Sequence, residues 1–325
     1  LSTASGRDLT EWGERWLRQS GVDILRPEVT VDETGRYTGV RIIATGPDGS
    51  AASRPHRVAV GVYDEVEGVL ARRQQVLVDL EPGTEATEVP TLVGAGEGRL
   101  LLVNDDDLSY TKIRLAGQGD PLTSLPGLTD PQARALVWQA AWDACRDAEL
   151  SANRLVELAA AALPSETHLP LYETMFATLC DPLIDRYLPP SQHPLALATL
   201  AGVARQVLTA AAPGSGWQLA AARGLLRCAQ PADVEWLQRW LSGEVPEGLI
   251  LDPDLRWSII ERLAVLGQAD EALIVAEQER DPSARGQQRA TWCRAARPDP
   301  AAKAEAWQLI TTDRKLSNRL LVAAA

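Results

Sequence analysis

The spacing of apolar residues changes once along this chain of 325 residues, and that change constrains the fold more than any single motif. From about Ile24 to Leu115, apolar residues alternate with small or polar ones, as in Val58-Val60-Val62 and Val76-Val78-Leu80. A period of two is typical of strands with one buried face. After about residue 130 the pattern is helical. Because the chain is too long for one ordinary core, we expect two domains.

Turn-forming residues separate the short runs of the first region. Their even spacing predicts an antiparallel β-sandwich over residues 23–116. The glycine run at 94–98 lacks the lysine and the following helix that a phosphate-binding loop requires, so we expect a hairpin turn there. The other predicted turns are Glu33-Thr34-Gly35, Gly46-Pro47-Asp48-Gly49, Glu67-Gly68 and Glu81-Pro82-Gly83.

Residues 131–325 are predicted to form an all-α domain, preceded by a linker over 117–130. About ten helices with short connections and no strict repeat favour a superhelical solenoid of the HEAT or armadillo kind. Asp181-Pro182 is either a helix start or a kink in a longer helix. Pro213-Gly214-Ser215-Gly216 breaks one helix before the next resumes at Trp217. Four other helices are predicted to start at an aspartate N-cap followed by proline, at Asp130, Asp252, Asp281 and Asp299.

Most tryptophans lie in this helical region. Trp138 and Trp142, like Trp236 and Trp240, are four residues apart and therefore share a helical face. Leucine and alanine neighbours favour core packing over an aromatic ligand platform. The other tryptophans of the region are Trp217, Trp257, Trp292 and Trp307.

The N-terminal segment reads as an amphipathic helix from Ser5 to Ser20, with Leu9, Trp12 and Trp16 on one face. Gly21 is placed to end it. The chain begins with Leu1 and its only methionine is Met175. We therefore expect a piece cut from a longer protein, with an upstream domain covering the two tryptophans.

Composition excludes several classes of protein. The net charge of −12 argues against a nucleic-acid partner. No apolar run approaches the ~20 residues needed to span a bilayer, so we expect no membrane partner. Arginine-rich basic residues and abundant alanine suggest a bacterial protein from a GC-rich genome. Widely spaced cysteines favour buried, reduced thiols in a cytoplasmic protein, namely Cys145, Cys180, Cys228 and Cys293.

Three adjacent carboxylates, Asp105, Asp106 and Asp107, are the most conspicuous candidate for chemistry. They could hold a hard cation. However, neighbouring side chains of an extended chain point to opposite faces, and the Asp-x-Asp-x-Asp-Gly spacing is missing. A hairpin turn at the end of the sandwich is therefore favoured, in which the aspartates accept hydrogen bonds from turn and inter-domain backbone amides. Replacing Asp106 with alanine should lower stability and leave the metal content unchanged.

No other residues form a pattern typical of catalysis or metal binding. The histidines lack a partner at metal-ligand spacing, which favours surface or capping roles for His56, His168 and His193. Ser215 is not within Gly-x-Ser-x-Gly. Asp143, Asp147 and Glu149 are expected to be solvated or paired carboxylates on a helix surface. We predict no catalytic, cofactor-binding or metal-binding residue in this chain.

Seven segments carry a family resemblance, in this order: Ser5-Gly6-Arg7-Asp8-Leu9, Arg54-Pro55-His56-Arg57, Asn104 to Leu115, Trp138 to Asp143, Pro213 to Gly216, Asp254 to Trp257 and Ala302 to Trp307. Together they resemble the aminopeptidase N family of zinc metallo-aminopeptidases, particularly its actinobacterial members. The resemblance implies that residues 1–22 form the terminal helix of a missing catalytic domain. The sandwich would then be followed by a helical domain that is incomplete at its C-terminus.

The resemblance also implies a function. Members of the family remove N-terminal residues from peptides, with zinc held by His-Glu-x-x-His and a downstream glutamate that would lie upstream of this chain. The fragment itself would bind no zinc and be inactive, and its helical domain would cap the catalytic cleft and limit substrate access. Its partners would be the catalytic domain of the same polypeptide and, in the parent, peptide substrates. The alternative is a free-standing protein-interaction scaffold.

Overall fold

The computed structural model describes residues 2–6, 8–313 and 316–325. Leu1 and Arg7, which fall in the predicted terminal helix, and residues 314–315 of the predicted solenoid lie outside the described residues. The chain divides into two compact units, residues 1–171 and 172–325. The first helices after the sheets therefore belong to the same unit as the sheets. The domain limits drawn from the sequence remain predictions.

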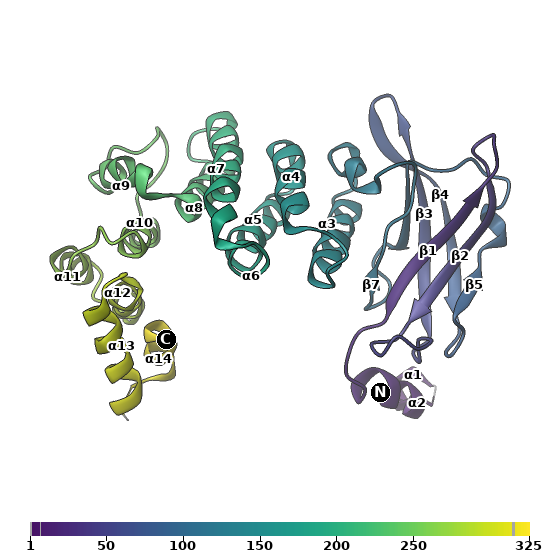
Figure 1. Cartoon of the computed structure of the whole chain (residues 1–325), viewed down its shortest axis with the longest axis horizontal. Helices are drawn as coiled ribbons and strands as arrows, with labels where there is room; N and C mark the ends of the chain where they lie inside the picture. The colour runs from purple at the N-terminus through teal and green to yellow at the C-terminus, as the bar shows by residue number, and fades with distance from the viewer. Residues whose placement is uncertain (1, 7, 314–315) are drawn as a thin grey trace. The chain divides into compact units, whose positions relative to one another are not determined.

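The first unit contains two β-sheets (Figure 1). Their strand orders are β5-β2-β1-β7 and β4-β3-β6. All paired strands are antiparallel except β1 and β7, which run parallel. The strands are β1 (Ile24–Val31), β2 (Tyr37–Thr45), β3 (His56–Val66), β4 (Val69–Leu80), β5 (Ala86–Glu88), β6 (Leu100–Asp105) and β7 (Lys112–Ile113).

One apolar core lies between the two sheets. Leu25 and Ile42 from the first sheet and Val60 and Val103 from the second are fully buried in it. Val58, Val60 and Val62 are the alternating residues of the sequence pattern, and all are 0% exposed. The predicted combination of β and α structure is confirmed. The solenoid arrangement stays a prediction.

Two connections predicted as hairpins are instead crossovers between the sheets. The glycine run at 94–98 lies between β5, in the first sheet, and β6, in the second. The segment after Asp105 leaves β6 and enters β7, which returns to the first sheet beside β1. Alternation and glycine content indicate that the chain turns. They carry no information about which sheet the next strand joins, and the hairpin predictions are wrong for this reason.

The N-terminal helix is shorter than predicted and is interrupted. α1 spans Ser2–Ser5 and α2 spans Thr10–Leu17. The carboxylate of Asp8 accepts a hydrogen bond at 2.9 Å from the amide of Thr10, the first residue of α2. Trp12 is 40% exposed, whereas Trp16 packs against His56 of β3. The expectation that an upstream domain buries both tryptophans is therefore wrong for Trp16.

The segment predicted as a linker is ordered against the sheets. It contains a 3-10 helix, Pro121–Gly127, capped by Asp120. Leu122 and Leu125 of this helix are buried, and Leu128 forms a β-bridge with Leu70 of β4. The helices α3 (Pro131–Arg146) and α4 (Ala152–Ala162) follow.

Most predicted helix starts are confirmed. The carboxylates of Asp130, Asp252 and Asp299 cap α3, α10 and α13. Asp281 does not cap a helix, because α12 begins two residues later with Ser283 as its N-cap. Asp181-Pro182 lies inside the π-helix Leu179–Leu183, so the kink alternative is correct. The remaining helices are α5 (Leu169–Thr178), α6 (Ile184–Tyr187), α7 (His193–Ala210), α8 (Gly216–Cys228), α9 (Val234–Leu241), α10 (Pro253–Val265), α11 (Glu271–Arg280), α12 (Ala284–Ala296), α13 (Pro300–Thr312) and α14 (Asn318–Ala324).

Core packing is confirmed for only some of the tryptophans. Trp138 and Trp257 are 1% and 0% exposed, and Trp240 packs edge-on against Trp236 with ring centroids 4.8 Å apart. Trp307 is 69% exposed, so the core prediction is wrong there. Helical spacing places residues on one face of a helix, but it does not say whether another helix covers that face.

Candidate functional site

The aspartate triplet ties β6 to the β3–β4 hairpin through side chains. Asp105 is buried, and its carboxylate accepts hydrogen bonds from the Tyr63 hydroxyl at 2.7 Å and from Arg72 at 2.8 Å. Asp106 accepts from the same guanidinium at 2.8 Å and from Gln75 at 2.6 Å. The prediction of backbone amide partners is therefore wrong. An arginine shared by two carboxylates occupies the position that a cation would need.

Backbone geometry confirms that the triplet lies in a tight turn. Asn104, Asp106 and Asp107 have φ angles of 59°, 75° and 53°, which non-glycine residues seldom adopt. The Asn104 side chain closes the turn, because it accepts from the Ser109 amide at 3.0 Å and donates to the Ser109 carbonyl at 2.8 Å. Within residues 2–6, 8–313 and 316–325, no three His, Cys, Asp or Glu side chains form a group that could hold a metal ion.

A second polar cluster is built around Asp23, immediately before β1. One carboxylate oxygen accepts from Arg54 at 2.8 Å, and the other lies 3.0 Å from His56 Nε2. His56 Nδ1 is 2.7 Å from the Ser109 hydroxyl. The side chains of Asp23 and His56 are 0% exposed. The prediction of a surface or capping role for His56 is therefore wrong.

The order Asp23, His56, Ser109 resembles a hydrolase triad, but its surroundings favour a structural role. Arg54 already pairs with the aspartate, and Trp16 lies edge-on to the buried imidazole with ring centroids 5.3 Å apart. A substrate could not reach the ring without displacing this tryptophan. The cluster therefore joins three segments that are distant in sequence.

Arg54 extends this cluster to the N-terminal helix. Its guanidinium donates to the backbone carbonyls of Arg15, Gln19 and Gly21 at 3.0 to 3.1 Å. These carbonyls lie at and beyond the end of α2, where a cation is favoured by the helix dipole. Arg54 thus anchors α2 to the edge of the sheets.

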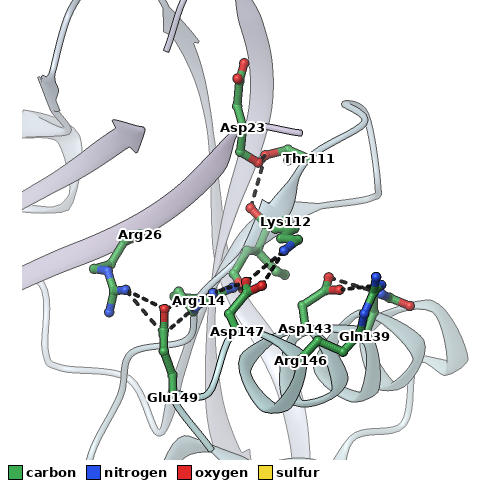
Figure 2. Close-up of polar contacts among 11 residues, drawn as sticks. Asp23, Arg26, Thr111, Lys112, Arg114, Gln139, Asp143, Arg146, Asp147 and Glu149 are labelled. Carbon is green, nitrogen blue, oxygen red and sulfur yellow. Dashed lines mark hydrogen bonds and ion pairs between the residues drawn. The ribbon is translucent and has the colours of Figure 1, made fainter. Parts of the chain in front are cut away.

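A third cluster joins the first sheet to the end of α3 (Figure 2). Arg114, directly after β7, is 5% exposed and donates to Asp147 at 2.7 Å and to Glu149 at 2.7 Å. Lys112 donates to both oxygens of Asp147 at 2.6 and 2.8 Å. Arg26 of β1 reaches Glu149 at 3.3 Å. We call these five residues the β7–α3 junction.

The backbone turn at the end of α3 directs the side chains of Asp147 and Glu149 toward β7. Ala148, between Asp147 and Glu149, has a φ of 62°, and the Glu149 amide donates back to the Ala144 carbonyl at 2.8 Å. A left-handed residue after a helix is the usual way to end it, although glycine is preferred there. Asp147 and Glu149 are thus paired, which is one of the two alternatives predicted for them. Asp143 is 4% exposed, so its predicted place on the helix surface is wrong.

Ion pairing within the junction lowers the pKa values of its two acids, Asp147 and Glu149. Hydrogen bonding from Arg114 lowers the pKa of Glu149. Burial would raise the pKa of Asp147, but hydrogen bonds from Lys112 and Arg114 outweigh it and leave that pKa below its ordinary value. Both acids are therefore more readily ionised in the folded chain than in the unfolded one.

The second unit contains a charged pocket of about 730 Å³. Arg289 spans its wall, where it lies 2.9 Å from Glu261 and 3.5 Å from Asp254. Burial raises the pKa of Glu261 despite this arginine. The acids and arginines of the lining largely neutralise one another. They include Asp181, Asp185, Arg223, Arg227, Arg262 and Arg285.

The remaining predicted candidates have structural positions. His193 Nε2 lies 3.0 Å from the Leu188 carbonyl, and His168 is exposed. Ser215 is the N-cap of α8, where its hydroxyl accepts from the Gln218 amide at 3.2 Å. All four cysteines are buried and free. Sequence reasoning missed the Asp23 cluster because its members are 33 and 53 residues apart.

No described helix is both long and apolar enough to cross a bilayer. A family model for the ERAP1-like C-terminal domain matches residues 100–325. Aminopeptidase N of Streptomyces lividans is 38% identical to this chain over 98% of the chain's length. The chain spans only 38% of the length of that relative.

Proposed function

The chain belongs to the family of ERAP1-like C-terminal domains, and on that premise we propose that it is the non-catalytic C-terminal region of a zinc-dependent aminopeptidase. The parent enzyme would remove N-terminal residues from peptides. The observation that carries the proposal is the alignment, which covers 98% of this chain but only 38% of an aminopeptidase N. The zinc site would belong to the catalytic domain of the same polypeptide.

Within such an enzyme, the helical region would cap the catalytic cleft and limit which substrates enter. We propose that its helices form a superhelical stack. The support is that helices adjacent in sequence pack together in the second unit, as α7 with α8 and α12 with α13 do, while α10 packs on α12 and α12 on α14. Packing between near neighbours in sequence is typical of solenoids.

Closing an active site expels water, and a helical cap over the cleft would need its first helix held in place. The β7–α3 junction supplies this support, because Arg114 is buried and binds two carboxylates at once. Bidentate arginine pairs fix orientation as well as distance. We therefore assign the junction the role of holding α3 against the sheets. Free, buried cysteines support a reducing, cytoplasmic location.

Two measurements test this function. The purified chain should contain no stoichiometric zinc by elemental mass spectrometry and should not hydrolyse aminoacyl-arylamides. One tightly bound zinc per chain, together with chelator-sensitive hydrolysis, would overturn the proposal. The reading frame of the parent gene should also encode His-Glu-x-x-His upstream of Leu1. A frame that starts at this residue with its own methionine would favour the interaction scaffold.

The capping role has a separate test in the full-length parent. Arg114→Ala should leave kcat/KM for a small aminoacyl-arylamide unchanged and alter the dependence of cleavage rate on peptide length. Arg26→Ala, at the exposed edge of the same junction, is the matched control. Identical length profiles for wild type and Arg114→Ala, in a variant that folds, would contradict this role.

A further inference from the structure

Two of the four free cysteines lie side by side. The Sγ atoms of Cys180 and Cys228 are 3.3 Å apart, although the residues are 48 positions apart in sequence. Cys180 is 6% exposed and Cys228 is 0% exposed. Cys145 and Cys293 are also buried, but in the described chain neither has a second sulfur within hydrogen-bonding distance. The chain therefore contains one thiol pair and two single thiols.

Two structural elements hold the pair together. Cys180 lies in the π-helix Leu179–Leu183, and Cys228 is the last residue of α8. The neighbouring residues Asp181 and Arg227 form an ion pair across the same contact. The two segments are thus joined by a buried contact between the two thiols and by an exposed ion pair beside it. π-helical turns are costly and often occur at functional positions.

We propose that Cys180 and Cys228 are a dithiol that hydrogen peroxide converts to an intramolecular disulfide. The bond would tie the π-helix between α5 and α6 to the end of α8. A disulfide has a sulfur–sulfur distance of about 2.05 Å, so the two atoms must approach by about 1.2 Å from 3.3 Å.

The reaction balances in two steps. The thiolate of Cys180, the more exposed of the pair, attacks one peroxide oxygen and breaks the O–O bond, which gives a sulfenic acid and, after protonation of the hydroxide, one water. The Cys228 sulfur then attacks the sulfenic sulfur and expels the hydroxyl as a second water. Both thiol protons leave in the products. The two thiols lose two electrons, and the peroxide gains them.

The surroundings both permit and slow this reaction. Asp181, Arg227 and Arg262 line the charged pocket, so a small oxidant can reach the residues that flank the pair. Arg262, which donates to the Ala229 carbonyl at 2.6 Å, interacts electrostatically with both thiols, and a cation favours the thiolate. Contact with Cys228 and burial raise the pKa of Cys180. The oxidation rate should therefore rise with pH, because the thiolate is the reacting form.

The test counts free thiols in the wild-type chain. After peroxide treatment and quenching, denatured protein is labelled with N-ethylmaleimide and weighed by intact mass spectrometry. The reduced chain, with four cysteines, should take four labels. The oxidised chain should take two, and a peptide containing linked Cys180 and Cys228 should disappear on reduction. Closing this loop should raise the melting temperature by roughly 5–10 °C.

Variants separate the pair from the single thiols. Cys145→Ser combined with Cys293→Ser should leave the linked peptide in place, whereas Cys228→Ser should abolish it. Retention of all four labels under conditions that oxidise the urea-unfolded chain would overturn the proposal. A link between any other two cysteines would overturn it as well. Because the wild-type measurement needs no substitution, a variant that fails to fold does not affect it.

Discussion

At the scale of single residues, the two aspartates that share Arg72 have different energetic roles. Asp105 is 1% exposed and is the only acceptor described for the Tyr63 hydroxyl. The Asp106 side chain is 41% exposed. A buried acceptor leaves unsatisfied donors behind when it is removed, whereas an exposed one is replaced by water. The stability of the turn should therefore depend on the buried member.

Asp105→Ala should lower the free energy of unfolding by about 2–4 kcal/mol, because it leaves the Tyr63 hydroxyl without its acceptor and removes the buried one of the two carboxylates that pair with Arg72. Asp106→Ala should cost less than about 1 kcal/mol, since exposed ion pairs contribute little. Urea unfolding followed by circular dichroism measures both. Asp107→Ala is the control, because its carboxylate accepts only a long bond of 3.3 Å from Asn104. Equal costs for Asp105 and Asp106 would contradict this account.

Among the helices and strands, those marked by local sequence signals were predicted correctly, whereas contacts between elements were not predicted. Alternation and turn residues located β3 and β4, and aspartate caps located α3, α10 and α13, because these signals are local. The partners of Asp105, and the pairing of Cys180 with Cys228, depend on which elements meet in space. Asp281-Pro282 was misassigned because Ser283 is an equally good cap two residues later. The sequence around this helix start does not distinguish Asp281 from Ser283 as the N-cap.

Acidification should weaken the β7–α3 junction. The pKa values of Asp147 and Glu149 are lower in the folded chain than their ordinary values of 3.8 and 4.5. Their ion pairs therefore stabilise the fold fully above about pH 5, and this stabilisation is lost as the pH falls through the folded pKa values. Urea midpoints measured between pH 7 and pH 3 should decline over the lower part of that range.

Arg114→Ala should flatten that decline and cost about 2–4 kcal/mol at pH 7, because it removes a buried bidentate partner. Arg26→Ala, whose side chain is 48% exposed, should cost less than about 1 kcal/mol and preserve the pH dependence. If both variants kept the full acid sensitivity of the wild type, other carboxylates would be its source.

Two glycines within helices, Gly286 and Gly202, should respond in opposite ways to substitution by alanine. A Cβ on Gly286, in the first turn of α12, would overlap the backbone carbonyl of Asp281, whereas nothing lies within 4 Å of a Cβ on Gly202 in α7. Gly286→Ala should therefore destabilise the chain by about 1–3 kcal/mol. Gly202→Ala should stabilise it by about 0.5–1 kcal/mol, because alanine favours helix. The melting temperature of each variant shows whether the substitution stabilises or destabilises the chain. A higher melting temperature for Gly286→Ala would contradict the predicted overlap with the Asp281 carbonyl.

At the scale of the whole molecule, the chain consists of two compact units that divide within α5, at Leu171 and Tyr172. Each unit has its own apolar core, with Val60 and Leu101 in the first and Trp257 and Ile260 in the second. A compact unit with its own core can unfold as a separate cooperative step. The ion pairs of the β7–α3 junction join the sheets to α3 within the first unit.

This division predicts two unfolding transitions that respond to different substitutions. Asp105→Ala, in the first unit, should lower only one melting temperature, and Gly286→Ala, in the second, only the other. Differential scanning calorimetry resolves the two steps, and the double variant should combine both shifts because distant substitutions are additive. Oxidation of the Cys180–Cys228 pair should raise the transition that Gly286→Ala lowers, since both lie in the second unit. A single transition that every substitution moves alike would mean that the units unfold as one.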